Sequence, residues 1–498
     1  MSSLPLVERL ASVPDPIEAA ACFADLPYLL LLDSAADPQR TGRFSFLSAD
    51  PSTVVRSRGK DAERLASSGV RWTPVAGDAL AEVRRWLAPY RHEPIPGMPP
   101  FQGGAAGYIG YDWGATLEQL PKTRYDDLHL WDVVLGLYDW VIAWDHCEHA
   151  AWIVSTGMPN SAADRAARAQ ERSSMVRGRL ASGPAARRAV NGPVAQAQAA
   201  PCYPVIGVEG VEDIGLRSTF THRGYLSAVS RVREYILAGD IFQANISQRF
   251  QAGLEEEPIQ FYRRLRRSNP AAFGAFLDFG EVQVLSASPE RFLKVSGRAV
   301  ETRPIKGTRP RGLGPMHDAL LGQVLAESDK DRAENVMIVD LLRNDLSRVC
   351  RPGTVRVPEL FALEQHPTVH HLVSTVVGTL EPGLDAVDLL RATFPGGSIT
   401  GAPKVRAMEI IAELEPTQRG IYCGSLGYLS VTGEMDTSIA IRTAVVHNGT
   451  VYFQTGGGIV ADSEPEAEYR ETLDKARGII RALASARAGA SSIADSSS

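Results

Sequence analysis

A single lysine in the segment 301–312 has the surroundings of a reactive amine. Lys306 lies between Pro304 and Pro310, and prolines fix φ and remove amide donors, so we expect a stiffened loop. Three arginines lie in the same segment: Arg303, Arg309 and Arg311. Their charge disfavours an ammonium, and partial burial disfavours it further, so Lys306 is expected to be a neutral, nucleophilic amine. The alternative is a basic anion-binding loop in which Lys306 is one more cation.

Carboxylates at helical spacing form a second candidate group, on a helix expected to begin after residue 463. Ser463 and Glu466 have the spacing of a capping box. The residues that share one face of this helix are Glu464, Glu468, Glu471 and Lys475. A glycine-rich turn at 455–458 precedes the helix and would aim backbone amides at the same end, which makes an anion site. The alternative is a charged stripe exposed to solvent.

A further glutamate, Glu334, lies on another predicted helix, at 329–349. Two glutamates from separate helices, Glu334 and Glu471, suit Mg²⁺, which commonly takes one or two carboxylates and lets a substrate oxygen complete its shell. The sequence has no Cys/His spacing typical of zinc.

The remaining candidates bind anions or exchange protons. Arg442, Lys475 and the glycine amides would bind carboxylates, while His371 and Glu290 would transfer protons. Together with Lys306, these residues indicate a small polyanionic substrate bound through Mg²⁺ beside a lysine nucleophile.

Composition excludes several classes of protein. The chain has 498 residues, 44% hydrophobic and 22% charged, with a net charge of −6. Mixed signs argue against nucleic acid as a partner, and the N-terminus has no apolar run long enough for a membrane anchor. The five cysteines are scattered and odd in number, which predicts reduced thiols in a cytoplasmic protein. None lies in a Gly-x-Cys-x-Gly setting, so a glutaminase nucleophile is not evident.

Shifts in composition divide the chain into four parts. We expect a sheet-rich region at 1–155, a linker or surface excursion at 156–215, a catalytic region at 216–485 and a disordered tail at 486–498. Within the first part, 28–32 and 43–47 have the patterns of strands, and the glycine cluster at 103–111 is interpreted as close backbone packing. An exposed helix is expected at 162–180.

The catalytic region contains a strand, at 241–250, with one apolar face and one uncharged polar face that includes Gln243. Strands are also predicted at 422–431 and 439–446, and a helix is predicted to end at about residue 414. A polar strand face of this kind borders water or lines a polar cleft.

Several long motifs resemble the chorismate-utilising enzymes, a family that includes anthranilate, aminodeoxychorismate, isochorismate and salicylate synthases. These motifs span about 222–480, in the family's order, and are found at 241–245, 288–291, 304–309, 333–341, 401–404, 441–443 and 455–475. The part before them corresponds to the family's more variable half.

The resemblance implies one large α+β fold, in which two antiparallel sheets pack face to face with helices outside. It implies Mg²⁺ held by Glu334 and Glu471 with help from Glu468, and acid–base roles for Glu290 and His371 beside a departing hydroxyl. The positions that match substrate-binding residues of the family are Gln243, Thr308, Ser398, Tyr422, Arg442, Gly456, Gly457 and Lys475.

Two positions discriminate within the family. Isochorismate and salicylate synthases have a lysine where this chain has Gln243, and anthranilate synthases usually have alanine where it has Lys306. The resemblance therefore favours the aminodeoxychorismate branch, with component I of an anthranilate synthase as the alternative. A catalytically inactive paralogue is a third possibility, against which the intact acidic and lysine positions argue.

The favoured branch implies a mechanism of two allylic displacements on chorismate. Lys306 attacks ring C2 as the C4 hydroxyl leaves, and ammonia then attacks C4 and expels the lysine. The ammonia comes from a glutamine amidotransferase partner, and the product, 4-amino-4-deoxychorismate, leads to para-aminobenzoate and folate.

A second ligand site is also implied, because one group of residues resembles the family's tryptophan pocket. The residues are Ser34, Arg43, Phe44, Asn269 and Pro270. Asp33 stands where the feedback-regulated enzymes usually have glutamate, so the resemblance leaves regulation open. The alternative is a plain strand-turn-strand.

Overall fold

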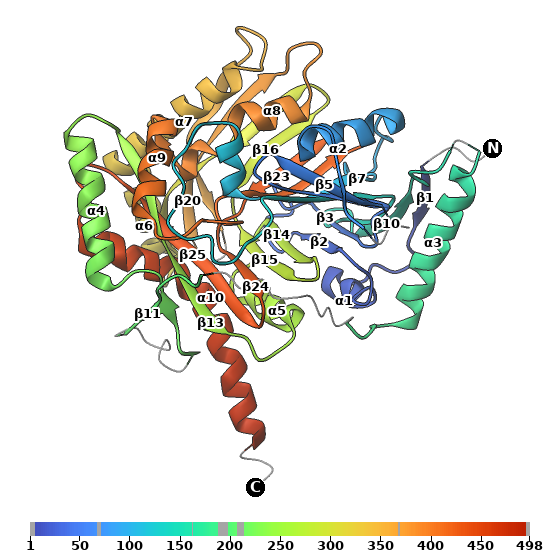
Figure 1. Cartoon of the computed structure of the whole chain (residues 1–498), viewed down its shortest axis with the longest axis horizontal. Coiled ribbons are helices and arrows are strands. Elements are labelled where there is room, and N and C mark those ends of the chain that lie inside the picture. The colour runs from blue at the N-terminus through green and yellow to red at the C-terminus, as the bar shows by residue number, and fades with distance from the viewer. Residues whose placement is uncertain are drawn as a thin grey trace.

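Two antiparallel sheets form the centre of the computed structural model, which describes residues 5–66, 71–161, 163–187, 198–206, 214–366 and 369–494 (Figure 1). Within these residues the first sheet has 13 strands, in the order β1 (Leu6–Arg9), β10 (Ala150–Ser155), β9 (Trp140–Asp145), β3 (Phe44–Ser48), β2 (Leu29–Asp33), β14 (Phe273–Asp278), β15 (Val282–Ser288), β24 (Thr443–His447), β25 (Thr450–Ile459), β13 (Gln243–Gly253), β12 (Arg217–Ser218) and β11 (Tyr203–Pro204), with β21 (Gly401–Ala402) paired to β13.

The second sheet has 12 strands among the described residues. Their order is β18 (Ile305–Pro310), β20 (Val369–Thr379), β17 (Ala299–Arg303), β16 (Arg291–Ser296), β23 (Met435–Ile439), β22 (Ser425–Ser430), β7 (Gly104–Ile109), β8 (Val133–Tyr138), β4 (Thr53–Arg58), β5 (Asp61–Ala66) and β6 (Thr73–Pro74), with β19 (Arg356–Gln365) paired to β20. The expected α+β fold with two antiparallel sheets is confirmed.

Helices cover the outer faces of both sheets, and an apolar core lies between them. Side chains of β2, β3 and β15 from the first sheet pack against side chains of β7, β8 and β22 from the second. The helices and short 3-10 turns are α1 (Pro16–Ala21), α2 (Ala79–Leu87), η1 (Ala88–Tyr90), η2 (Tyr111–Thr116), α3 (Arg165–Ser182), α4 (His222–Leu237), α5 (Pro258–Ser268), α6 (Pro315–Ala326), α7 (Asp329–Ser347), α8 (Ala386–Thr393), η4 (Gly397–Ile399), α9 (Lys404–Leu414) and α10 (Pro465–Ala494).

The sequence regions before and after the predicted linker share both sheets. Strand β2 pairs with β14 in the first sheet, and β7 pairs with β22 in the second. Figure 1 accordingly shows blue strands beside yellow and orange ones. In the predicted linker, 188–197 and 207–213 lie outside the described residues, and α3 occupies the position of the expected helix. Helix α10 continues to Ala494, and residues 495–498 of the expected tail lie outside the described part.

Most local predictions match the structure, because they rest on short-range periodicity. Strands β2, β3 and β13 and helix α7 lie where alternation and helical spacing indicate. The glycine cluster serves backbone packing as expected: a Cβ on Gly107 would lie 2.1 Å from the carbonyl oxygen of Val134. Among the described helices, none is both long enough and apolar enough to cross a membrane.

Three local predictions are wrong. The glycine-rich segment 455–458 is not a turn, because it lies inside β25 and pairs with β13. The segment 301–312 is not a loop, because β17 and β18 form there on either side of Pro304 and both pair with β20. The predicted strand 439–446 is interrupted between β23 and β24, where Arg442 has a φ of +52°. Pairing with distant strands decides all three cases, and local composition contains no record of it.

Candidate active site

A β-bulge in strand β18 positions Lys306. Between Ile305 and Thr308 the strand advances three residues while its partner β20 advances two, so one residue is extra. Gly307 takes a φ of +80° there, which is the backbone conformation of a glycine bulge and one that other residues adopt at a cost. Bulges re-aim side chains, and this one turns Lys306 toward the segment 397–399.

The amine of Lys306 lies in a largely enclosed position. Its Nζ donates to the carbonyl oxygen of Ser398 at 3.1 Å. Burial lowers the pKa of Lys306, opposed by the negative charges of Glu334 and Glu290 and assisted by the positive charge of Lys475. The amine is therefore more easily deprotonated than an exposed lysine.

The arginines of the same segment have other partners, so our expectation that their charge lowers the pKa of Lys306 is wrong. Each forms an ion pair with a carboxylate, which neutralises its field. The pairs are Arg303 with Glu364 at 2.6 Å, Arg309 with Asp331 at 2.8 Å and Arg311 with Asp318 at 2.5 Å. Burial takes the place of these arginines as the main cause of the lowered pKa.

Glu290 is a buried carboxyl group whose pKa favours proton transfer near neutrality. It is 5% exposed, and Oε1 accepts a hydrogen bond from the hydroxyl of Ser398 at 2.7 Å. Burial raises its pKa to about 7, although the Ser398 hydroxyl and Lys306 act in the opposite direction. Ser398 thus contacts both the candidate acid and the candidate nucleophile.

A buried ion pair holds the segment that carries Ser398. The Nζ of Lys404 donates to Asp345 on α7 at 2.6 Å and to the carbonyl oxygen of Thr393 at the end of α8 at 2.7 Å. Lys404 belongs to a family motif but was given no role in the sequence analysis. Its contacts tie α7, α8 and α9 together beside η4.

His371 is held as a neutral imidazole. Its Nδ1 lies 3.0 Å from the hydroxyl of Thr308, and its ring packs edge-on against His366 with centroids 5.1 Å apart. Burial, with the positive charges of His366 and Arg442, lowers its pKa to about 3. His371 can therefore donate or accept a hydrogen bond at neutral pH, but it is not an imidazolium acid.

Two of the candidate metal glutamates, Glu468 and Glu471, lie beside the glycines of strand β25, where the sequence had predicted a turn. A Cβ on Gly457 would lie 2.8 Å from Oε2 of Glu468 and 3.5 Å from Oε1 of Glu471, so glycine is what admits both. Burial raises the pKa of Glu334 and of Glu468. Burial also acts on Glu471, but the Lys475 ammonium 2.6 Å away lowers its pKa overall.

No preformed cluster of three acidic, histidine or cysteine ligands occurs among the described residues. The three glutamates nevertheless influence one another, because Glu471 raises the pKa of both Glu334 and Glu468. Mutually repelling, partly buried carboxylates fit a hard cation that needs few protein ligands, as Mg²⁺ does.

Two cations border the same glycines of β25 without a full set of anionic partners. Lys475 Nζ donates to the carbonyl oxygen of Gly456 at 2.7 Å, and Arg442 donates to the carbonyl oxygen of Lys475. Burial lowers the pKa of Arg442, and no ion pair between described residues includes its guanidinium. A desolvated guanidinium without a carboxylate is suited to a substrate carboxylate. Tyr422, also buried, lies near Arg442, whose pKa it acts to raise, and its ring lies beneath the guanidinium of Arg419.

Two amide side chains on β13 present unpaired groups. Gln243 is 1% exposed, and neither its Oε1 nor its Nε2 has a partner; Oδ1 of buried Asn245 also has none. A Cβ on Gly458 would lie 2.2 Å from Nε2 of Gln243. Such groups cost free energy unless a ligand or water satisfies them. Asn245 was not singled out from the sequence, although it alternates with Gln243 on the polar strand face.

A separate cavity of about 310 Å³ lies between the two sheets. Ser34, Arg43 and Phe44 line it, as the sequence predicted, whereas Asn269 and Pro270 do not belong to its lining. Asn269 caps α5 and lies against Gly478 of α10. Lining residues that the sequence analysis missed come from the opposite sheet and include Arg291, Lys294, Tyr428 and Asp436.

Asp33, at the rim of this cavity, is already engaged by protein groups. Its carboxylate accepts from the hydroxyl of Tyr262 at 3.0 Å and from Nε of Arg266 at 2.6 Å. Ser34 is similarly held, because its hydroxyl donates to the carbonyl oxygens of Phe44 and Ala272 at 2.8 Å each. The polar rim is therefore fixed before any ligand enters.

Comparison with known proteins places these groups in a family context. Residues 29–481 match the family model described as chorismate binding enzyme. The chain is 44% identical to aminodeoxychorismate synthase component 1 of Salmonella typhimurium, over 96% of this chain and 98% of that one. It is 42% identical to the Escherichia coli protein of the same name, over 93% and 94%. It is 39% identical to anthranilate synthase component 1 of Pseudomonas aeruginosa, over 96% and 94%.

Solved structures agree on the fold. Anthranilate synthase component I from Streptococcus pneumoniae superposes with a TM-score of 0.73 and 31% identity, covering 88% of this chain and 92% of that one. The menaquinone-specific isochorismate synthase MenF of Escherichia coli has a TM-score of 0.68 at 18% identity, over 96% and 95%, which is a likeness of fold alone.

Proposed function

The chain belongs to the family of chorismate binding enzymes, and we propose that it converts chorismate and ammonia to 4-amino-4-deoxychorismate as the chorismate-converting component of an aminodeoxychorismate synthase. The observation that carries this assignment is Lys306, raised on a bulge with a lowered pKa beside Glu290. Its product leads to para-aminobenzoate and folate.

The proposed reaction is two displacements across the ring. The neutral amine of Lys306 bonds to C2, both conjugated double bonds of the ring shift by one position, and the C4 hydroxyl leaves as water with the proton of Glu290. Ammonia then bonds to C4, both double bonds shift back, and Lys306 leaves as an amine. The ammonium formed at C4 returns its extra proton to Glu290. The enolpyruvyl group is retained.

The other residues hold the substrate in this geometry. Arg442, Lys475, Tyr422 and the amides of Gly456 and Gly457 bind its carboxylates. Neutral His371, oriented by Thr308, hydrogen-bonds near the departing hydroxyl, and Ser398 aligns the acid. The unpaired amide of Gln243 satisfies its hydrogen bonds on the substrate, and an amide does not activate water as a lysine at this place would.

Mg²⁺ is the proposed cofactor, held by Glu334, Glu468 and Glu471. When bound, the ion neutralises a carboxylate of chorismate. The raised pKa values of Glu334 and Glu468 and the approach of two glutamates to Gly457 support these ligands.

A glutamine amidotransferase is the proposed partner and source of ammonia. The relatives are named component 1, and this sequence has no cysteine in the setting of a glutaminase nucleophile. The five cysteines are all free, which fits a reducing compartment, and we place the protein in the cytoplasm.

Product analysis tests the assignment. Purified chain, chorismate, Mg²⁺ and an ammonium salt should yield 4-amino-4-deoxychorismate by chromatography and mass spectrometry. Anthranilate with released pyruvate would establish the alternative, which the similarity to anthranilate synthases supports. Isochorismate formed without ammonia would contradict both.

The cavity between the sheets is proposed to bind tryptophan. Phe44, Phe273 and Tyr428 supply aromatic walls, and Arg43 and Asp436 supply opposite charges. Calorimetric titration should show binding of tryptophan, and Phe44→Ala should weaken it. If Phe44→Ala bound tryptophan as tightly as the parent, or if the parent bound none, the region would be a plain strand-turn-strand with no tryptophan site.

A further inference from the structure

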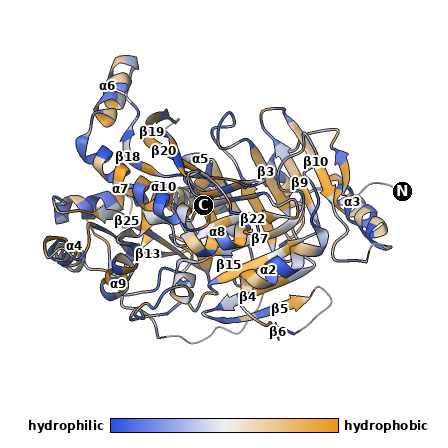
Figure 2. Cartoon of the chain, turned by 90° about the horizontal axis from the view of Figure 1, so that it is seen from above, coloured by the Kyte–Doolittle hydropathy of each residue, from blue (hydrophilic) through white to orange (hydrophobic). Residues whose placement is uncertain are grey.

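Helix α6 is apolar on both its inner and its outer side. Gly322 and Leu325 are buried against the body of the protein. Three other side chains of the helix, together with Leu313 just before it, form an exposed stripe that we call the α6 apolar face: Leu313 at 101%, Met316 at 90%, Leu320 at 56% and Val324 at 47% exposure. A helix whose outer side carries an apolar stripe normally buries that stripe against another element or a partner. In Figure 2 α6 protrudes from one end of the molecule.

The inner side of α6 is anchored to the candidate active site. A Cβ on Gly307, the neighbour of Lys306, would lie 2.8 Å from Cδ1 of Leu325. Asp318 accepts from Nε2 of His370 at 2.9 Å, next to His371, and pairs with Arg311. The helix therefore contacts both β18 and β20 at residues beside the proposed nucleophile.

The charge pattern of α6 identifies the kind of surface. The chain is 22% charged, yet Asp318 is the one Asp, Glu, Lys or Arg residue in α6, and it points inward to its partners. Depletion of charge around exposed Leu and Met is characteristic of the centre of a protein–protein interface.

The size of the face argues against a second copy of the same chain. Obligate homodimers bury about 2,000 Å² or more, and even a standard complex buries about 800 Å² on each partner. Four side chains on one protruding helix and the residue just before it supply the apolar centre of a standard or smaller interface, as in a complex of two different proteins.

We propose that the α6 apolar face is the docking site of the glutamine amidotransferase component. This inference rests on the proposed function, which requires such a partner. Ammonia released into neutral water becomes ammonium and loses the lone pair that attacks C4. A partner seated on α6 would release it one helix away from the strand that carries Lys306.

Charge insertion on the face tests the proposal. The variants are Leu320→Glu and Val324→Glu, and the matched control is Val13→Glu, because Val13 is also 47% exposed and lies near the first strand of the N-terminal region. Three quantities are measured: turnover with an ammonium salt, turnover with glutamine plus the purified amidotransferase component from the same genome, and the Kd of the two components.

The α6 variants should keep the ammonium-dependent rate of the parent, while the Kd rises and the glutamine-dependent rate falls by about tenfold or more. Val13→Glu should change none of these. An unchanged Kd in both α6 variants would overturn the proposal. So would a parallel loss of both activities at constant Kd, which would make α6 part of the catalytic unit.

Two controls separate this proposal from the proposed function. If the parent chain makes no aminodeoxychorismate from ammonium, the proposed function fails, while the Kd series still reports on docking. If sedimentation shows that the chain alone is a dimer which Leu320→Glu dissociates, the face is a homodimer contact and the proposal is wrong.

Discussion

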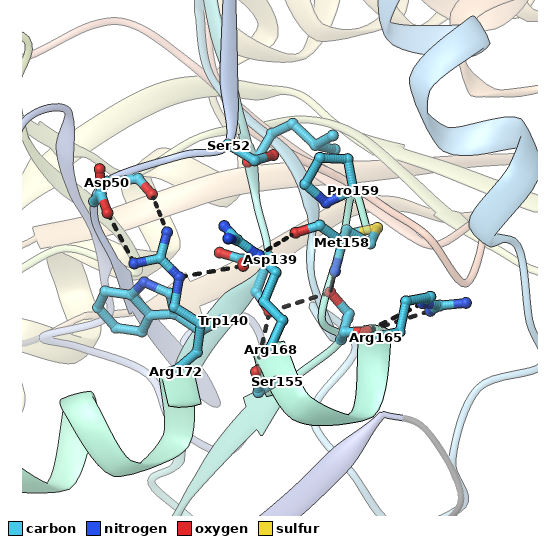
Figure 3. Close-up of polar contacts among 12 residues, drawn as sticks. Asp50, Ser52, Asp139, Trp140, Ser155, Met158, Pro159, Arg165, Arg168 and Arg172 are labelled. Carbon is cyan, nitrogen blue, oxygen red and sulfur yellow. Dashed lines mark hydrogen bonds and ion pairs between the residues drawn. The ribbon is translucent and has the colours of Figure 1, made fainter. Parts of the chain in front are cut away.

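Two buried carboxyl groups, Asp139 and Glu290, differ in the partners that surround them. Asp139 accepts from Nε of Arg168 at 2.7 Å and from Nε of Arg172 at 3.2 Å. Arg172 continues to Asp50 at 2.8 Å, so α3 is fastened to the start of β9 (Figure 3). Burial raises the pKa of Asp139, and the two guanidinium groups oppose it.

Glu290, by contrast, has a hydroxyl and a lysine amine as neighbours. The Ser398 hydroxyl donates to it at 2.7 Å, and Lys306 bonds to a backbone carbonyl instead. None of the ion pairs among the described residues includes Glu290. A carboxyl with permanent cationic partners holds the fold, whereas one with exchangeable neighbours is able to transfer a proton. The difference lies in the partners, since both groups are buried.

Removal of the nucleophile should have the largest effect. Lys306→Ala is expected to lower aminodeoxychorismate formation by about 10³-fold, because the covalent path is lost. Residual ammonia chemistry should shift toward C2, giving anthranilate. Mass spectrometry after an acid quench of the parent should find a substrate-derived mass on the peptide that contains Lys306. If the alanine variant formed aminodeoxychorismate at the parental rate, Lys306 would not be a nucleophile and would be only an anion-binding cation.

Removing the carboxylate of Asp139 should lower the stability of the protein and leave its catalytic activity unchanged. Asp139→Asn leaves two buried guanidinium groups without their carboxylate and should lower the free energy of unfolding by about 3 kcal/mol. Denaturant titration measures this, and ammonium-dependent turnover at low temperature should match the parent, because α3 and α6 lie at opposite ends of the molecule in Figures 1 and 2. If the Asp139→Asn variant were stable but inactive, the structural role of Asp139 and its contrast with Glu290 would be wrong.

The metal glutamates should behave as functional groups. Glu471→Gln is expected to weaken Mg²⁺ binding, measured by calorimetry, and to lower turnover by about a hundredfold, with the unfolding transition little changed. Glu464→Gln, an exposed change one residue before the start of the same helix, is the matched control and should alter neither quantity. Equal Mg²⁺ affinity in the two variants would contradict the assignment.

The smallest expected effect is on how stability changes with pH. Glu290→Gln should stabilise the protein at high pH, whereas Asp139→Asn should destabilise it. The pKa of Glu290 is raised from 4.5 to about 7 by burial, so the folded state binds more protons than the unfolded state between these values. Stability from this group is present below pH 4.5 and is lost as pH rises to about 7. A glutamine at this position has no carboxyl group to ionise, so the Glu290→Gln variant does not lose this stability as the pH rises. Its Tm should exceed the parent's by more at pH 8 than at pH 5, and an equal difference at both would contradict the buried-acid description.

The sequence by itself determined the family and the local elements. The alternation in β2, β3 and β13, the helical spacing in α7 and the packing role of the glycine cluster at 103–111 are all readable from neighbouring residues. Lys306, Glu290 and the glutamates of α10 were singled out because their motifs are contiguous or lie at fixed helical spacing. Contiguous motifs and fixed spacings of this kind can be recognised without knowledge of the fold.

Tertiary structure decided what depends on partners far along the chain. The bulge at Gly307 exists because β18 pairs with β20, and the pairing of Arg303 with Glu364 removes the charge that had been expected to act on Lys306. Burial by distant segments sets its pKa instead. The cavity between the sheets takes half its lining from strands more than two hundred residues away from Phe44, and α6 is recognisable as an unpartnered face only once its inner side is seen to be covered. Strand pairing and burial join residues without regard to their separation in sequence, so local pattern contains no trace of them.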